Sequence, residues 1–140
     1  FDAATGKLTP GEQPWMETEP GAGPRHLAFH PSGKWVYVLN ELNSTLTAAA
    51  YDGEAGTLKS LQSLSTIPAG GVPGNSGAEV VAHPNGKFVY SSNRGHDSIA
   101  MFATGTPAIR SSAVARIRGS PSHSVGASSR ISGSRTVLST

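Results

Sequence analysis

Hydrophobic residues alternate with turn-forming residues along the first hundred positions of the chain. The apolar stretches at 27–29 and 80–82 end at the turns HPSGK (30–34) and HPNGK (83–87), in which Pro, a polar residue and Gly favour a tight reversal. Short runs rich in β-branched and aromatic residues follow each turn, and such runs predict β-strands. The predicted strands are residues 27–29, 35–40, 44–51 and 58–66, then 80–82, 88–93 and 97–102.

The chain repeats itself. A shift of 53 positions places residues 26–50 on residues 79–103, so that HPSGKWVY lies on HPNGKFVY and Asn40 on Asn93. A second repeat, with a shift of 50, pairs FDAATGKL at the start with YDGEAGTL from Tyr51. A recurring unit of about 50 residues indicates a fold built from similar blocks.

Four antiparallel strands in about 50 residues are typical of one blade of a β-propeller. We therefore predict an all-β protein, with the end of one blade, a complete blade over 25–70 and most of a third blade within residues 1–104. Propellers have four to eight blades, so the chain is expected to be a partial propeller. The alternative is a plain β-sandwich made of hairpins.

Residues 105–140 differ in composition from the part before them. Residues 1–104 hold all nine acidic residues against six Lys or Arg, a net charge of −3, whereas 105–140 hold five Arg, ten Ser and no acidic or aromatic residue. We expect this Arg/Ser-rich tail to be disordered or not native sequence, because the expected Asp-x-x-x-Gly-x-Leu turn is missing after Phe102. Nucleic-acid binding by the tail is disfavoured, since it has no aromatic side chain for base stacking.

Other features of the composition exclude classes of protein. The chain has no Cys, which rules out disulfides and thiolate chemistry, and no apolar run long enough to cross a membrane.

Charged residues occupy equivalent positions in the two repeats. His26 aligns with Glu79 just before the innermost predicted strand, and Glu41 aligns with Arg94 just after the second. The start of one strand and the end of its antiparallel neighbour lie at the same edge of a sheet. We therefore expect these four side chains at one end of the central channel, where their differing identities suggest a site rather than packing.

Several other residues have two interpretations. His96 and Asp97 lie where the predicted loop after residues 88–93 meets the next strand, and either line the site or shape the turn. His30 and His83 repeat beside Pro and are expected to serve the turn. The Gly-rich loop 70–77 lacks the strand-loop-helix setting of a phosphate loop. A zinc site formed by His26, His96 and Glu79 is an alternative without supporting ligand spacing.

The segments GPRHLAFHPSGKWVYVLNEL and NSGAEVVAHPNGKFVYSSNRGHDSIAMF resemble the seven-bladed propeller lactonase family. The resemblance rests on GPRH, LNE, AE and SNRGHDSI, and extends from residue 1 to about 103. It implies hydrolysis of a sugar lactone by 6-phosphogluconolactonase activity in the pentose phosphate pathway, with a phosphorylated small-molecule substrate, no cofactor and a cytoplasmic location. The 140 residues alone are expected to be inactive.

Within this resemblance, the chemistry suggests roles for individual residues. Glu79 or His26 would activate water and Arg94 would stabilise the oxyanion, because a base and a donor are what lactone hydrolysis needs. The expected substrate-binding residues are Arg25, which fits a phosphate, and Glu41, His96 and Asp97. No GxSxG motif is present, which favours direct attack by water. The alternatives are a muconate-type lactonizing cycloisomerase and a non-catalytic binding propeller.

Overall fold

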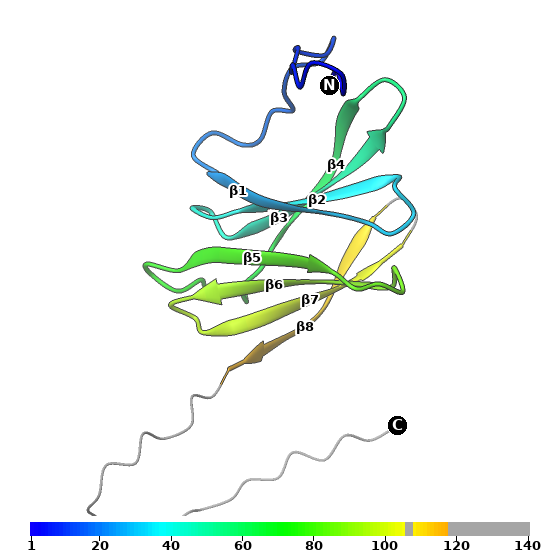
Figure 1. The fold of residues 1–140 in the computed structure, drawn as a ribbon. Helices are drawn as coiled ribbons and strands as arrows, with labels where there is room; N and C mark the ends of the chain where they lie inside the picture. Colours follow the sequence, from blue (N-terminus) through cyan, green and yellow to red (C-terminus); the bar gives the residue numbers. More distant parts are fainter. Residues whose placement is uncertain (106–107, 118–140) are drawn as a thin grey trace, which may run out of the picture.

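The computed structural model describes residues 1–105 and 108–117, which form two antiparallel sheets of four strands each (Figure 1). The first sheet contains β1 (Pro24–Phe29), β2 (Trp35–Asn40), β3 (Thr45–Asp52) and β4 (Thr57–Ser65). The second contains β5 (Ser76–Ala82), β6 (Phe88–Arg94), β7 (Ser98–Thr104) and β8 (Ile109–Arg116). In each sheet the strands neighbour one another in chain order.

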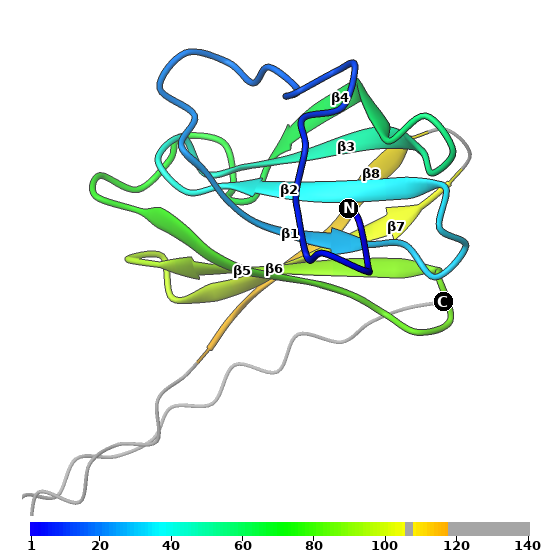
Figure 2. The same ribbon diagram turned by 45° about the horizontal axis from the view of Figure 1, so that its top comes forward.

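This arrangement confirms the prediction of propeller blades. The two sheets repeat the same four-strand meander, and the first strand of one sheet lies beside the first strand of the next. Both views place the turns β1–β2 and β5–β6 at one end of the molecule and the turns β2–β3 and β6–β7 at the other (Figures 1 and 2). The sandwich of unrelated hairpins is therefore not the fold.

The repeated HPxGK turn has the conformation that its glycine requires. Gly33 and Gly86 both have φ of +70°, a left-handed backbone that residues with a Cβ rarely adopt. The backbone N–H of each glycine donates to the carbonyl of the histidine that opens its turn, at 2.9 Å for His30 and 2.8 Å for His83. Two equivalent turns thus join the first and second strands of both blades.

The hydrophobic core fills the space between the blades. Alternate residues of β2 and β3 face it, and the register places Leu39 opposite Leu46. From the second blade, Phe102 contributes the largest buried side chain and is fully enclosed. Burying one such side chain stabilises the fold by about 1.5–3 kcal/mol, so this core holds the two blades together. Its other members are Tyr37, Ala48, Val80, Val89, Ala100 and Ile109.

Strand β8 corrects the prediction for the C-terminal segment. Residues 109–116 pair with β7 as the fourth strand of the second blade, whereas the sequence led us to expect no structure after Thr104. Ile109 is 2% exposed and belongs to the core. Without the Asp- and Gly-containing turn found before β4, composition alone did not reveal this strand. Residues 118–140, where the rest of the predicted tail falls, lie outside the described residues.

Candidate functional site

Both innermost strands are irregular where the candidate residues lie. The pairing of β1 with β2 shifts between Pro24 and His26, and that of β5 with β6 shifts between Gly77 and Val80. A β-bulge redirects the side chains of the extra residues. Arg25 and Glu79 lie within these shifts. His26 and Glu79 were predicted just before the innermost strands, but both lie inside β1 and β5. The irregularity lets the side chains of two neighbouring blades meet.

His26 and Glu79 form a pair across the two blades. His26 Nδ1 lies 3.0 Å from Glu79 Oε1, and the backbone N–H of Val80 donates to the same oxygen at 2.9 Å. The N–H of Val80, and secondarily His26, lower the pKa of the Glu79 carboxyl. An ionised carboxylate only accepts hydrogen bonds, so Nδ1 carries the proton and Nε2 of the neutral ring is an acceptor. Both side chains are about half exposed, at 42% and 55%.

Beside this pair, Glu41 joins two arginines from different blades. Its Oε2 accepts from Arg25 Nη1 at 3.1 Å, and its Oε1 accepts from Arg94 Nη2. Carbonyls of the second blade hold the same guanidinium groups: Arg25 Nε donates to Ala78 O at 3.0 Å and Arg94 Nη2 to Gly77 O at 3.1 Å. The structure therefore brings together five predicted residues, Arg25, His26, Glu41, Glu79 and Arg94, which we call the inter-blade cluster.

The cluster makes a prediction about the pH dependence of stability. The hydrogen bond from Arg25 chiefly lowers the pKa of the Glu41 carboxyl, burial opposes this, and Arg94 adds to the lowering. A carboxyl with a lower pKa in the folded than in the unfolded chain stabilises the folded state above its unfolded pKa, and this stabilisation is lost as pH falls through the folded pKa.

We therefore expect wild type to resist urea better than Glu41→Gln near neutral pH. The difference should shrink as the pH falls below 4.5, the ordinary value for glutamate. Urea midpoints of both proteins across this range measure the effect, and Glu54→Gln, at an exposed turn position, serves as the control. A difference between wild type and Glu41→Gln that did not change with pH would contradict the assignment.

His96 and Asp97 are not bonded to the cluster. His96 Nδ1 lies 2.7 Å from Ser98 Oγ, and its backbone N–H donates to Asn75 Oδ1 at 3.0 Å. Asp97 adopts φ of +52°, and its Oδ1 accepts from Gly95 N at 3.3 Å. Asp97 thus shapes the β6–β7 turn, and substrate binding by His96 and Asp97 stays a prediction.

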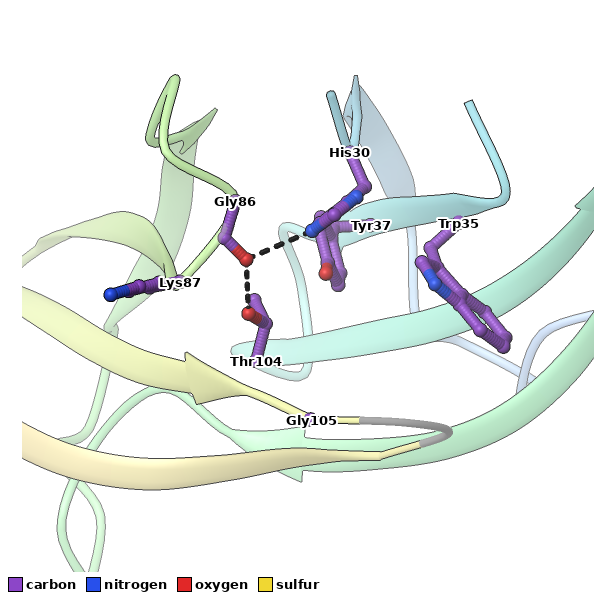
Figure 3. A pocket seen from close by; sticks show the side chains of 7 residues that line it. All are labelled: His30, Trp35, Tyr37, Gly86, Lys87, Thr104 and Gly105. Atoms are coloured by element: carbon purple, nitrogen blue, oxygen red, sulfur yellow. Dashed lines mark hydrogen bonds between the residues drawn. The ribbon is translucent and has the colours of Figure 1, made fainter. Parts of the chain in front are cut away.

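His30 and His83 lie at the opposite end of the blades, where each bonds to a residue of the repeated turns. This is the turn role that the sequence led us to expect. His30 Nε2 lies 2.8 Å from Gly86 O, and His83 Nδ1 accepts from Asn85 N at 3.1 Å. A hollow of about 260 Å³ lies between these turns (Figure 3). Thr104 also donates to Gly86 O there, so polar groups of the hollow bind one another. We interpret it as the groove between blades, lined by His30, Trp35, Tyr37, Gly86, Lys87, Thr104 and Gly105.

Sequence reasoning missed the backbone of residues 77 and 78, whose carbonyls hold both arginines. Every residue carries a carbonyl, so no side-chain pattern could have identified these two. Within residues 1–105 and 108–117, no three His, Cys, Asp or Glu side chains gather as a metal site would require. The zinc triad of His26, His96 and Glu79 is not assembled there. The same residues contain no helix long and apolar enough to cross a membrane.

A comparison with protein families decides what the blades belong to. The model of the family described as "Lactonase, 7-bladed beta-propeller" matches residues 1–119. The chain belongs to this lactonase family. The match continues past Thr104 through β8, so the expectation that the family resemblance stops near residue 103 is wrong.

Several named proteins match part of this lactonase chain. It is 46% identical over 83 residues to 6-phosphogluconolactonase of Bacillus subtilis, which is 59% of this chain and 24% of the relative. It is 39% identical over 99 residues to 6-phosphogluconolactonase of Pectobacterium carotovorum, or 71% and 30% of the two chains. The structure of the periplasmic gluconolactonase of Pseudomonas aeruginosa superimposes with a TM-score of 0.69 at 30% identity. The match covers 74% of this chain and 29% of the gluconolactonase. The chain thus spans about a quarter to a third of each relative's length.

Proposed function

We propose that the protein containing these two blades hydrolyses a sugar lactone, and that the inter-blade cluster supplies part of its active site. The observation that carries this proposal is the His26–Glu79 pair beside the guanidinium groups of Arg25 and Arg94. In this proposal the pair supplies a base, and the two arginines supply cations beside it. The names of the relatives, 6-phosphogluconolactonase and gluconolactonase, support the same reaction.

His26 is the general base in this proposal. Its Nδ1 donates to Glu79, and Nε2 has no partner among residues 1–105 and 108–117. Nε2 would accept a proton from water while the water oxygen attacks the lactone carbonyl carbon. Glu79 fixes the orientation of the ring and stabilises the imidazolium that forms. The sequence left open which of the two residues acts as the base, and the pairing favours His26.

Arg94 stabilises the oxyanion in this proposal. Only its Nη2 is bonded among the described residues, to Glu41 and Gly77, so Nη1 and Nε keep N–H groups for a substrate oxygen. The carbonyl π electrons move onto that oxygen as the water adds. The tetrahedral intermediate then collapses, the ring C–O bond breaks, and the departing alkoxide takes the proton from His26.

Arg25 and Glu41 have supporting roles in this mechanism. Arg25 is a cation suited to a substrate phosphate, which favours 6-phosphogluconolactone and the pentose phosphate pathway. Glu41 holds the two guanidinium groups, and we now assign it to positioning rather than to direct substrate binding. We retain the cytoplasm as the proposed location, while the Pseudomonas aeruginosa relative is described as periplasmic.

The test is a lactonase assay on a full-length protein that contains these blades. We expect it to open 6-phosphogluconolactone faster than unphosphorylated gluconolactone, with the spontaneous rate at the same pH subtracted. Equal rates on the two lactones would remove the phosphate from the proposal. Cyclisation of 3-carboxymuconate without lactone hydrolysis would establish the cycloisomerase instead, and inactivity on all three would leave a binding propeller.

A further inference from the structure

The segment between β4 and β5 ends at Asn75, whose side chain joins two loops. Asn75 Nδ2 donates to Ser44 Oγ at 2.7 Å, in the β2–β3 turn of the first blade. Asn75 Oδ1 accepts from the backbone N–H of His96 at 3.0 Å, in the β6–β7 turn of the second. Glu41 opens the first of these turns, and Arg94 immediately precedes the second. One amide therefore connects the turns that carry the two partners of an inter-blade ion pair.

The contacts fix the orientation of the amide. The oxygen has to face the N–H of His96, because the amide nitrogen in that position would set two donors against each other. The nitrogen then faces Ser44 Oγ and, at 3.4 Å, Asn93 Oδ1. Ser44 is 4% exposed and has φ of +54°, so the last residue of this turn is buried and its backbone is strained. A donor and an acceptor on one short side chain are what this position requires.

The backbone around Asn75 approaches Arg94 closely. Gly95 has φ of +99°, and a Cβ there would lie 3.2 Å from Asn75 Cα, so only glycine fits without displacement. Two residues beyond Asn75, Gly77 accepts from Arg94 Nη2 at 3.1 Å, and its N–H donates to Glu41 O at 2.9 Å. The segment 74–77 thus contacts both members of the ion pair.

We propose that Asn75 is a positioning residue for the lactonase site: it holds the β6–β7 turn against the β2–β3 turn so that Arg94 meets Glu41 and directs its remaining N–H groups into the channel. The kinetic part of this proposal rests on the proposed function. The geometric part does not, since it concerns only the contact between Arg94 and Glu41. Sequence analysis assigned no role to the Gly-rich loop 70–77, and in this proposal its residue Asn75 has a positioning role.

The kinetic test is a double-mutant cycle in the full-length protein. Asn75→Ala should lower kcat/KM about tenfold or more, since a displacement near 1 Å can cost up to 10²-fold. In the Arg94→Ala background the same change should have almost no further effect, because Asn75 acts through Arg94. Asn75→Asp keeps an acceptor for the N–H of His96 and should recover part of the rate. Asn85→Ala, in the HPNGK turn at the other end, is the matched control.

The outcomes separate positioning from a general effect on stability. An equal loss in both backgrounds, or no loss in either, would overturn the proposal. If the wild-type protein opens no lactone, the proposed function fails. The geometric part of the proposal is then tested by NMR titration of the Glu41 carboxyl. Asn75→Ala should raise its pKa toward the ordinary value as Arg94 leaves, while Asn85→Ala should not. An unchanged titration in Asn75→Ala would refute the positioning role whatever the activity.

Discussion

His26→Ala should lower kcat for lactone hydrolysis about 100-fold or more in a full-length protein that carries these blades, because general bases contribute about 10² to 10⁴. Arg94→Ala should lower kcat about as much, through loss of an oxyanion donor. Glu79→Gln should have a smaller effect, since glutamine still accepts from the His26 ring but lacks the charge that stabilises imidazolium. Initial rates at saturating substrate, corrected for spontaneous hydrolysis, measure these effects.

The matched control is His83→Ala, a histidine of the repeated turn at the opposite end of the blades. Its ring accepts from Asn85 N and lies near Tyr90, with ring centroids 6.3 Å apart. We expect a lower melting temperature with kcat within about threefold of wild type, because a structural loss need not change the transition state. Wild-type turnover in both His26→Ala and Glu79→Gln would contradict this mechanism and require a different group as the base.

Ile109→Ala should lower the free energy of unfolding by about 2–5 kcal/mol, the usual range for truncating a buried Ile. Ile109 is 2% exposed in the core between the blades, and its N–H donates to Gln62 Oε1 of β4 at 3.1 Å. The substitution leaves a cavity but keeps the backbone hydrogen bond. Denaturant unfolding monitored by tryptophan fluorescence gives the difference in free energy.

Ile117→Ala is the control for this experiment. Ile117 follows the end of β8 and is 58% exposed, so its truncation should change stability by less than about 0.5 kcal/mol. Equal stability of Ile109→Ala and Ile117→Ala would show that β8 does not belong to the core. It would also restore the original expectation that the folded part ends near Thr104.

Much of the blade architecture follows from local patterns. The HPxGK turns, the β-branched runs after them and the shift of 53 positions placed seven of the eight strands near their observed positions. Local rules reach this far because turn geometry depends on a few neighbouring residues and side chains alternate along a strand. These local rules did not predict strand β8. Its residues, IRSSAVAR, are mostly exposed and small, and only Ile109 is buried.

The candidate site was also only partly predictable from the sequence. The repeat alone indicated that His26, Glu79, Glu41 and Arg94 share one end of the channel, because equivalent positions of antiparallel strands reach the same edge. It did not show that His26 would bond to Glu79 or that Glu41 would bridge Arg25 and Arg94. Those pairings depend on the β-bulges at Arg25 and Glu79 and on the packing of one blade against the next.

The sequence by itself therefore determined the strands β1 to β7, the repeated turns and the end of the blades at which charged residues gather. Only the tertiary structure decided which of these charges pair, that Asp97 shapes a turn, and that Asn75 links the turns next to Glu41 and Arg94. The physical reason is distance along the chain. Strand and turn preferences act over a few residues, whereas the partners His26 and Glu79 are 53 positions apart and meet only when the core between the blades closes.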